Sequence, residues 1–267
     1  MSTHPSPLLR VNLKALRLPT MLAEHEKLAR DAAAGNQSHE EYLLRLTELE
    51  LAARSANALA ARIRQAEFPV LKDLDSYDFS ALPSLNKAKI LEMARCEWIR
   101  QRSNCCLVGS VGTGKTPIAI SLGLAACRDL LRVRYFTAAA LVNLLEEKQK
   151  QYQLDKLLGQ LDRLDLLIGD ELGHRTFSRS GAELLFQVFA DRYERKSLLL
   201  TSNLAFSEWT TIFHGERMTA ALLDRLTHHC QIFEMNGESY RFRESMKRKR
   251  KRKRKPGDPD SSKPAEG

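Results

Sequence analysis

Apolar and polar residues follow two different periods along this chain, and the change of period divides it. Over residues 8–66, apolar side chains recur at steps of three and four, which predicts amphipathic helices. From about residue 104 onwards, short apolar runs alternate with longer helical patterns. Such runs between helices are typical of buried parallel strands, so we expect a small all-helical domain followed by an α/β domain.

The first 66 residues are predicted to form three helices. Two cover 11–18, before Pro19, and 20–34, before Gly35-Asn36. The third begins after Ser38, because Ser38 and Glu41 have the spacing of a capping box. The apolar positions of this helix lie on one face: Tyr42, Leu46, Leu49, Ala53, Ala56, Ala60 and Ile63. That face packs against the second helix or contacts a partner helix or DNA.

The remaining chain is predicted to contain a linker, an α/β domain and a tail. Residues 67–84 hold two prolines and mixed polarity, which indicates a linker. A helix follows over 84–101, and strands are expected at 105–108, 132–136, 164–169, 198–203 and 230–235. The domains are therefore expected at 1–66, 85–244 and 245–267, with a parallel sheet flanked by helices in the second. A ligand would lie beyond the carboxyl ends of its strands.

A phosphate-binding loop follows the first of these strands. The pattern GxxxxGK[ST] is matched by Gly109, Ser110, Val111, Gly112, Thr113, Gly114, Lys115 and Thr116. Its glycines free backbone N–H groups to converge on phosphate oxygens, and the next helix adds the positive end of its dipole. Lys115 supplies a charge for the β- and γ-phosphates, and the Thr116 hydroxyl can bind Mg²⁺. Pro117 falls in the first helical turn, where proline is tolerated.

Two further strands end in polar residues that suit the same chemistry. The run 164–169 is followed by Asp170-Glu171, and the run 198–203 ends in Asn203. Asp170 would hold Mg²⁺ through water, and Glu171 could act as the general base for the attacking water. Asn203 could hydrogen-bond that water or the γ-phosphate. Because parallel strands end at one edge of a sheet, the sequence predicts that these residues meet there to hydrolyse a nucleoside triphosphate.

The net charge of +9 comes from one segment of the chain. Residues 247–255 read KRKRKRKRK, and the remaining 33 Lys and Arg balance the 33 Asp and Glu. Such a run repels itself and stays disordered alone. It would attract nucleic acid or an anionic membrane surface, although a solvated tail or a localisation signal has the same composition.

Composition also suggests where the protein acts. No apolar run approaches the roughly 18 residues of a membrane span, so we expect no membrane insertion. The first residues lack the sustained apolar stretch of a signal peptide. Five cysteines without metal-ligand spacing indicate reduced thiols, which favours a cytoplasmic protein.

The sequence resembles the IstB-like family of insertion-sequence helper ATPases, a branch of AAA+ proteins close to the DnaC-type helicase loaders. The resemblance covers about residues 11–244 and rests on these segments: LKALRLPTM, FPVLKDLDSYDFS, GSVGTGKT, GDELG, LLLTSNLAFSEW, ALLDRLTHHC and NGESYRFR. It implies an ATPase that assembles on double-stranded DNA as a homo-oligomer and delivers the target to a partner transposase.

The resemblance also implies roles for individual residues. Asn203 corresponds to sensor 1, and Arg225 to an arginine finger that acts on ATP held by the neighbouring subunit. Arg241 is a weaker candidate for a second sensor. The sequence departs from the family at Ser110-Val111, Pro117-Ile118, Gly169 and 174–177. None of these departures removes a catalytic group, although Gly169 weakens a central strand and bears on turnover.

Two other functions stay open from the sequence. One is a replicative helicase loader, which would have the same fold and another partner. The other is a DNA-binding scaffold that uses ATP as a switch and hydrolyses it little. A neighbouring transposase gene would support transposition, and DNA-stimulated phosphate release would distinguish an ATPase from a scaffold.

Overall fold

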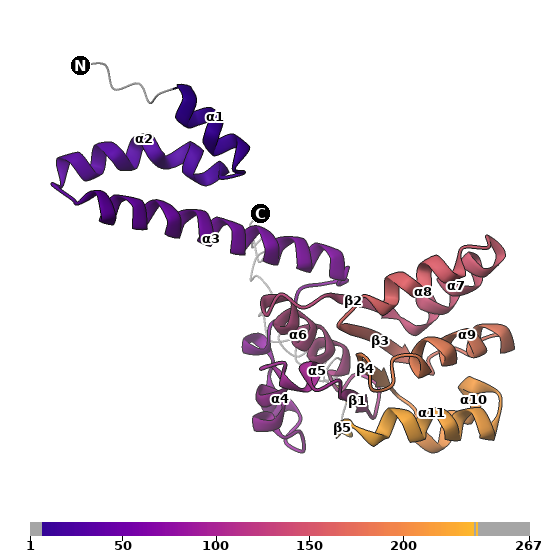
Figure 1. Cartoon of the computed structure of the whole chain (residues 1–267). Coiled ribbons are helices and arrows are strands. Elements are labelled where there is room, and N and C mark those ends of the chain that lie inside the picture. Colours follow the sequence, from indigo (N-terminus) through magenta and orange to yellow (C-terminus); the bar gives the residue numbers. More distant parts are fainter. Residues whose placement is uncertain (1–6, 238, 240–267) are drawn as a thin grey trace, which may run out of the picture. The chain divides into compact units, whose positions relative to one another are not determined.

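The computed structural model describes residues 7–237 and residue 239, and the chain divides into two compact units, Met1–Arg64 and Gln65–Gly267 (Figure 1). Arg241 and the basic run 247–255 lie outside the described residues. Among the described residues, no helix combines the length and the apolar character needed to cross a bilayer.

The first unit confirms the predicted helical region. It contains α1 (Pro7–Ala15), α2 (Pro19–Ala34) and most of α3 (His39–Ala66), around a core of Leu13, Met21, Leu28 and Leu46. The first predicted helix has the wrong bounds, because it ends at Ala15. Arg17 has a left-handed backbone (φ 56°), and Leu18 N–H donates to Leu13 O over 2.9 Å, which closes the helix before Pro19.

Side chains of α3 stabilise this unit at two helix ends. Glu41 N–H donates to Ser38 Oγ over 3.1 Å and Ser38 N–H donates to the Glu41 carboxylate over 2.9 Å, so the predicted capping box is confirmed. The buried Glu50 carboxylate accepts the Thr20 and Met21 N–H groups at 2.8 and 3.0 Å, which caps α2.

Only part of the predicted apolar face of α3 is buried within this unit. Leu46 is buried and Tyr42 half-buried against α1 and α2, as expected for packing on the second helix. Farther along, Leu49, Ala56 and Ala60 are exposed. The packing interpretation therefore holds for the first turns of the helix.

The second unit contains the predicted parallel sheet. Its strands are β1 (Asn104–Val108), β2 (Val133–Thr137), β3 (Leu166–Leu172), β4 (Ser197–Ser202) and β5 (Cys230–Glu234). They pair in parallel in the order β2-β3-β4-β1-β5. Each lies within two residues of a predicted run except at the end of β3, which extends through the acidic pair to Leu172.

Helices cover both faces of this sheet (Figure 1). One face contacts α6 (Lys115–Arg128), and the other lies under α7 (Ala138–Lys150), α9 (Arg179–Ala190) and α11 (Glu216–His228). Successive residues of β3 face opposite sides of the sheet: Ile168 faces Gly123 of α6, and Gly169 faces Phe189 of α9. A Cβ on Gly169 would lie 2.8 Å from Leu200 Cδ2, so the Leu200 side chain occupies the space that a larger residue would need.

The other elements are short and include one wrong prediction. They are η1 (Leu74–Ser76), η2 (Phe79–Ala81), α4 (Lys87–Met93), α5 (Glu97–Arg100), α8 (Leu154–Asp162), η3 (Phe206–Glu208) and α10 (Thr210–Phe213). The single helix predicted over 84–101 is broken between α4 and α5. Cys96 has a left-handed backbone (φ 62°), and the cap is Asn86, whose side chain accepts the Lys89 N–H over 3.0 Å.

Asp165 connects the beginnings of three strands. Its carboxylate accepts the Arg132 backbone N–H at 2.9 Å and guanidinium at 2.9 and 3.0 Å, and the Lys196 ammonium at 3.0 Å. Burial alone would raise the pKa of Asp165, but these hydrogen bonds outweigh it and lower that pKa. The ionised carboxylate therefore stabilises the folded state.

We predict that Asp165→Asn lowers the free energy of unfolding at pH 7 by about 1.5–3 kcal/mol, the range for hydrogen bonds to a charged group. Because the folded pKa is lowered, wild type has this stabilisation above the unfolded pKa of about 3.9 and loses it as pH falls further. Urea unfolding at pH 7, 5 and 3 should show a similar difference between the two proteins at pH 7 and 5 and a smaller one at pH 3.

Asp162→Asn is the matched control, since Asp162 is 49% exposed in its ion pair with Arg195. It should cost at most about 1 kcal/mol. A difference between Asp165→Asn and wild type that does not change with pH would contradict the assigned role of the charge.

Candidate functional site

Three glycines of the loop between β1 and α6 have a positive φ, and close contacts at Gly109 and Gly114 show why a side chain does not fit there. A Cβ on Gly109 (φ +148°) would lie 2.3 Å from Met235 O, so the backbone of Met235 occupies the space of any side chain. Gly114 (φ +95°) has a left-handed backbone, and a Cβ there would lie 2.6 Å from the Tyr77 hydroxyl. The loop can keep this shape only with the glycines of the motif.

Lys115 lies against this loop. Its ammonium donates to Gly109 O and Ser110 O, each over 2.7 Å, and the residue is half-buried. Burial lowers the pKa of Lys115, and the negative charge of Asp170 partly offsets this effect. A phosphate at the loop would favour the charged form of Lys115 in the same way.

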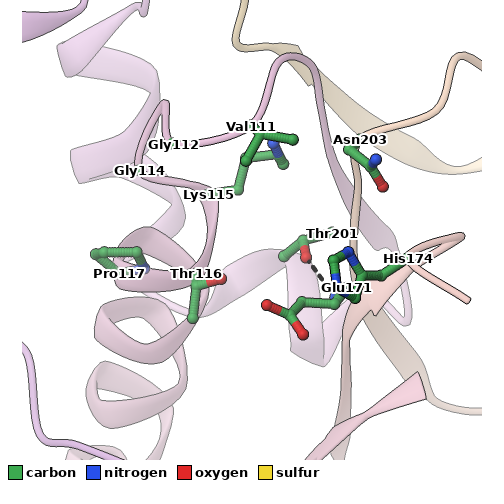
Figure 2. Close-up of a pocket in the computed structure, with 10 residues that line it drawn as sticks. All are labelled: Val111, Gly112, Gly114, Lys115, Thr116, Pro117, Glu171, His174, Thr201 and Asn203. Atoms are coloured by element: carbon green, nitrogen blue, oxygen red, sulfur yellow. Dashed lines mark hydrogen bonds between the residues drawn. The ribbon is translucent and has the colours of Figure 1, made fainter. Parts of the chain in front are cut away.

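Residues of the phosphate loop and of the sheet edge line one cavity. It has a volume of about 190 Å³ and is lined by Val111, Gly112, Gly114, Lys115, Thr116, Pro117, Glu171, His174, Thr201 and Asn203. Figure 2 shows Lys115 and Thr116 on one side of it, and Glu171, His174 and Asn203 on the other. Because β1, β3 and β4 end at this edge, the expected convergence of their terminal residues is present in the structure.

Asp170 is not among the residues that line this cavity and is 1% exposed. Three hydroxyls donate to its carboxylate: Thr116 to Oδ1 over 3.0 Å, Tyr135 to Oδ2 over 2.6 Å, and Thr201 to Oδ1. Burial raises the pKa of Tyr135, and its hydrogen bond to Asp170 raises it further, so the phenol keeps its proton and donates. Thr116 and Asp170 together offer the oxygen ligands that Mg²⁺ prefers.

Glu171 follows with a left-handed backbone (φ 60°) and an exposed side chain. Its N–H donates to Thr201 Oγ1 over 2.9 Å, and Figure 2 marks this bond. Its carboxylate points into the cavity between Thr116 and His174 (Figure 2). The sequence patterns assigned roles to Asp170 and Glu171 but none to Tyr135, Thr201 and His174.

A second cavity lies beside the phosphate loop. It has a volume of about 210 Å³ and shares Gly114 and Pro117 with the first. Its outer wall comes from residues 72–82, which we expected to form a linker and which lie in the second unit. Tyr77 donates to Thr113 O over 3.3 Å, and burial, with Asp78 nearby, raises its pKa to about 12. This segment therefore covers one side of the loop.

The two predicted arginines are placed differently. Arg225 lies in the last turn of α11, is exposed, and does not line the cavity of its own chain. This placement leaves it available to another molecule. Arg241 lies outside the described residues.

We predict that Gly114→Ala lowers the free energy of unfolding by about 1–2 kcal/mol for the left-handed backbone alone, with a further cost from the contact with Tyr77. Tyr77→Ala should remove the contact cost but not the backbone cost, so the double variant should lose less stability than the two single changes together. A double-mutant cycle in urea measures this coupling.

Gly159→Ala is the control, because Gly159 lies in α8 and a Cβ there would meet nothing within 4 Å. Replacing a helical glycine in open space should stabilise the protein by up to about 1 kcal/mol. If Gly114→Ala behaves like Gly159→Ala, the loop does not need its glycine.

Proteins of insertion sequences resemble this chain along most of its length. One, named for ATP binding in insertion sequence IS5376 of Geobacillus stearothermophilus, is 37% identical over 229 residues, covering 86% of this chain and 91% of the relative. Another, named for ATP binding in insertion sequence IS21 of Pseudomonas aeruginosa, is 32% identical over 239 residues, covering 90% of each chain.

Among solved structures, the replication initiator DnaA bound to AMPPCP and single-stranded DNA is similar in fold. The TM-score is 0.51 at 19% identity, and the match covers 66% of this chain and 54% of that one. The similarity supports the predicted fold class, a parallel sheet flanked by helices.

The family description "IstB-like ATP binding protein" matches residues 11–248. This range includes the phosphate loop, the acidic pair and Asn203, and it agrees with the resemblance seen in the sequence. The chain therefore belongs to the IstB-like family of ATP-binding proteins.

Proposed function

We propose that this protein binds and hydrolyses Mg·ATP, and that it assists transposition by assembling on double-stranded DNA and recruiting a transposase. One observation carries the catalytic part: Lys115, Glu171 and Asn203 come from separate elements and line one cavity at the carboxyl edge of the sheet. Membership of the IstB-like family supports the role in transposition.

ATP would bind across the phosphate loop. The loop N–H groups and the N-terminus of α6 would bind the phosphates, and Lys115 would exchange its two carbonyl partners for the β- and γ-phosphate oxygens. The second cavity, lined by Tyr77 and Pro117, is the proposed place for the base. Gly114 and Pro117 line both cavities, so the two proposed subsites adjoin each other.

Thr116 and Asp170 are the proposed holders of Mg²⁺. Their oxygens lie 3.0 Å apart and form a hard, anionic donor set, which fits this ion. When bound, Mg²⁺ would neutralise charge that develops on the phosphate oxygens. The hydroxyls of Tyr135 and Thr201 would fix the orientation of the Asp170 carboxylate.

Glu171 is the proposed general base. It would take a proton from a water molecule whose oxygen attacks the γ-phosphorus, while the bond between that phosphorus and the bridging oxygen of ADP breaks. Asn203 is the proposed group that orients this water, since its side chain faces the same cavity as Glu171. Both residues lie opposite Lys115 in Figure 2.

Arg225 is proposed to complete the site of a neighbouring subunit. It is exposed and absent from its own cavity, as an arginine finger acting between subunits would be. Assembly as a homo-oligomer follows from this role. The basic run 247–255 is proposed to bind DNA phosphates without reading sequence.

We predict that Lys115→Ala abolishes detectable binding of a fluorescent ATP analogue, because it removes the charge held at the loop. Glu171→Gln should bind the analogue normally and stop phosphate release, since the amide keeps the shape and cannot accept the proton. Lys150→Ala, at the exposed end of α7, is the control for loss of a lysine and should leave both measurements unchanged.

Phosphate release with and without duplex DNA also separates the functions that the sequence left open. An ATPase should release phosphate faster when DNA is added. If wild type binds nucleotide and DNA but releases no phosphate under either condition, the ATP-switched scaffold replaces the ATPase. Normal analogue binding by Lys115→Ala would overturn the nucleotide site itself.

A shared site predicts complementation between two inactive variants. Arg225→Ala lacks the finger and Glu171→Gln lacks the base, so a mixed assembly contains some interfaces with both groups intact. Mixing them should restore hydrolysis that neither variant shows alone, because a finger is worth roughly 10³–10⁵ in rate in well-studied enzymes. Absence of rescue at every ratio, in mixtures shown by size measurement to co-assemble, would contradict action between subunits.

A further inference from the structure

The acidic pair lies at an irregularity in the sheet. In the pairing of β3 with β4, Gly169 is opposite Leu200 and Leu172 is opposite Ser202. Two residues of β3, Asp170 and Glu171, therefore face one residue of β4, Thr201. This is a β-bulge, which is rare between parallel strands.

The bulge changes where the two acids point. In a regular strand, neighbouring side chains lie on opposite faces of the sheet, so Asp170 and Glu171 would be separated. The left-handed backbone of Glu171 (φ 60°) breaks this alternation. As a result the Glu171 carboxylate faces the cavity while Asp170 stays buried beside Thr116.

A left-handed glutamate needs support from its surroundings. A non-glycine residue in this conformation costs about 1–3 kcal/mol and persists only where neighbouring groups hold it. The bulge also removes the partner that the Glu171 N–H would have in a regular ladder. Thr201 Oγ1 accepts this N–H at 2.9 Å, so a side chain replaces the missing backbone acceptor.

The same hydroxyl also binds the other acid. Thr201 Oγ1 donates its proton to Asp170 Oδ1 while it accepts from Glu171. Of the three hydroxyls that donate to Asp170, those of Thr116 and Tyr135 have no such bond to Glu171 among the described contacts. Thr201 is 1% exposed, and loss of its hydroxyl would leave the Glu171 N–H without the acceptor described here.

We propose that Thr201 is a positioning residue that sets both acids of the site through one hydroxyl: it orients the Asp170 carboxylate and holds the Glu171 backbone in the bulge. The catalytic consequence rests on the proposed function, whereas the effect on the bulge does not.

Three variants separate these effects. Thr201→Val keeps the shape and removes the hydroxyl, Thr201→Ser keeps the hydroxyl, and Tyr135→Phe removes a hydroxyl that binds only Asp170 Oδ2. Amide hydrogen exchange at Glu171, measured without nucleotide, should become about tenfold faster in Thr201→Val, because its acceptor is gone. Thr201→Ser and Tyr135→Phe should keep the Glu171 amide protected.

The same proteins test the consequence for the site. Loss of a group that orients a metal-binding carboxylate typically costs 10–100-fold in metal affinity or activity. Thr201→Val and Tyr135→Phe should therefore both need about tenfold more Mg²⁺ for tight binding of the ATP analogue. At saturating Mg²⁺, Thr201→Val should still release phosphate about 10–100-fold more slowly than wild type, and Thr201→Ser should recover most of this loss.

The outcomes distinguish this proposal from the ATPase assignment. Wild type that binds no nucleotide would overturn the proposed function, and the exchange measurement would still decide whether Thr201 holds the bulge. An unchanged Glu171 exchange rate in a folded Thr201→Val protein would overturn the positioning role. An equal loss of turnover in Thr201→Ser and Thr201→Val would also overturn it, since the hydroxyl would then not be the group that acts.

If Thr201→Val does not fold, the exchange rate at Glu171 in Thr201→Ser decides. A rate equal to that of wild type supports the positioning role of the hydroxyl, and a faster rate counts against that role.

Discussion

The structure around the candidate site depends on the burial of one carboxylate. Asp170 is 1% exposed, and a buried carboxylate is costly unless its oxygens accept hydrogen bonds. Here the donors are hydroxyls from β2, from the first turn of α6 and from β4. Tyr135 and Thr201 can reach Asp170 only if β2 and β4 have the correct register against β3, and Thr116 only if α6 begins beside the same edge. The hydrogen bonds that one buried carboxylate needs therefore constrain much of the sheet edge.

The phosphate loop depends on close contacts in a similar way. Tyr77 lies where a side chain on Gly114 would be, and the backbone of Met235 lies where one on Gly109 would be. The loop is therefore held between residues 72–82 on one side and the end of β5 on the other. Its shape comes from these neighbours as much as from its own glycines.

The sequence predicted the features that depend on local pattern or on general rules of parallel sheets. The strands, the phosphate loop and the meeting of Lys115, Glu171 and Asn203 at one edge are of this kind, and the structure contains them. The roles of these residues stay predictions.

What could not be predicted depends on contacts between distant residues. Tyr135 and Thr201 bind Asp170 only through pairing of the strands, and nothing near them in the sequence marks that role. The break between α4 and α5 is similar, because Cys96 is buried and Trp98 donates to Met93 O over 2.9 Å. Propensity favoured a continuous helix at this point, and tertiary packing overrode it.

The contact between Gly109 and β5 has a mechanical consequence. Met235 N–H donates to Val108 O over 2.7 Å, and its carbonyl lies directly against Gly109. Met235 is also fully buried, so it cannot move aside into solvent. A shift of the first loop residue would therefore also displace the chain at the point where it leaves the sheet after β5.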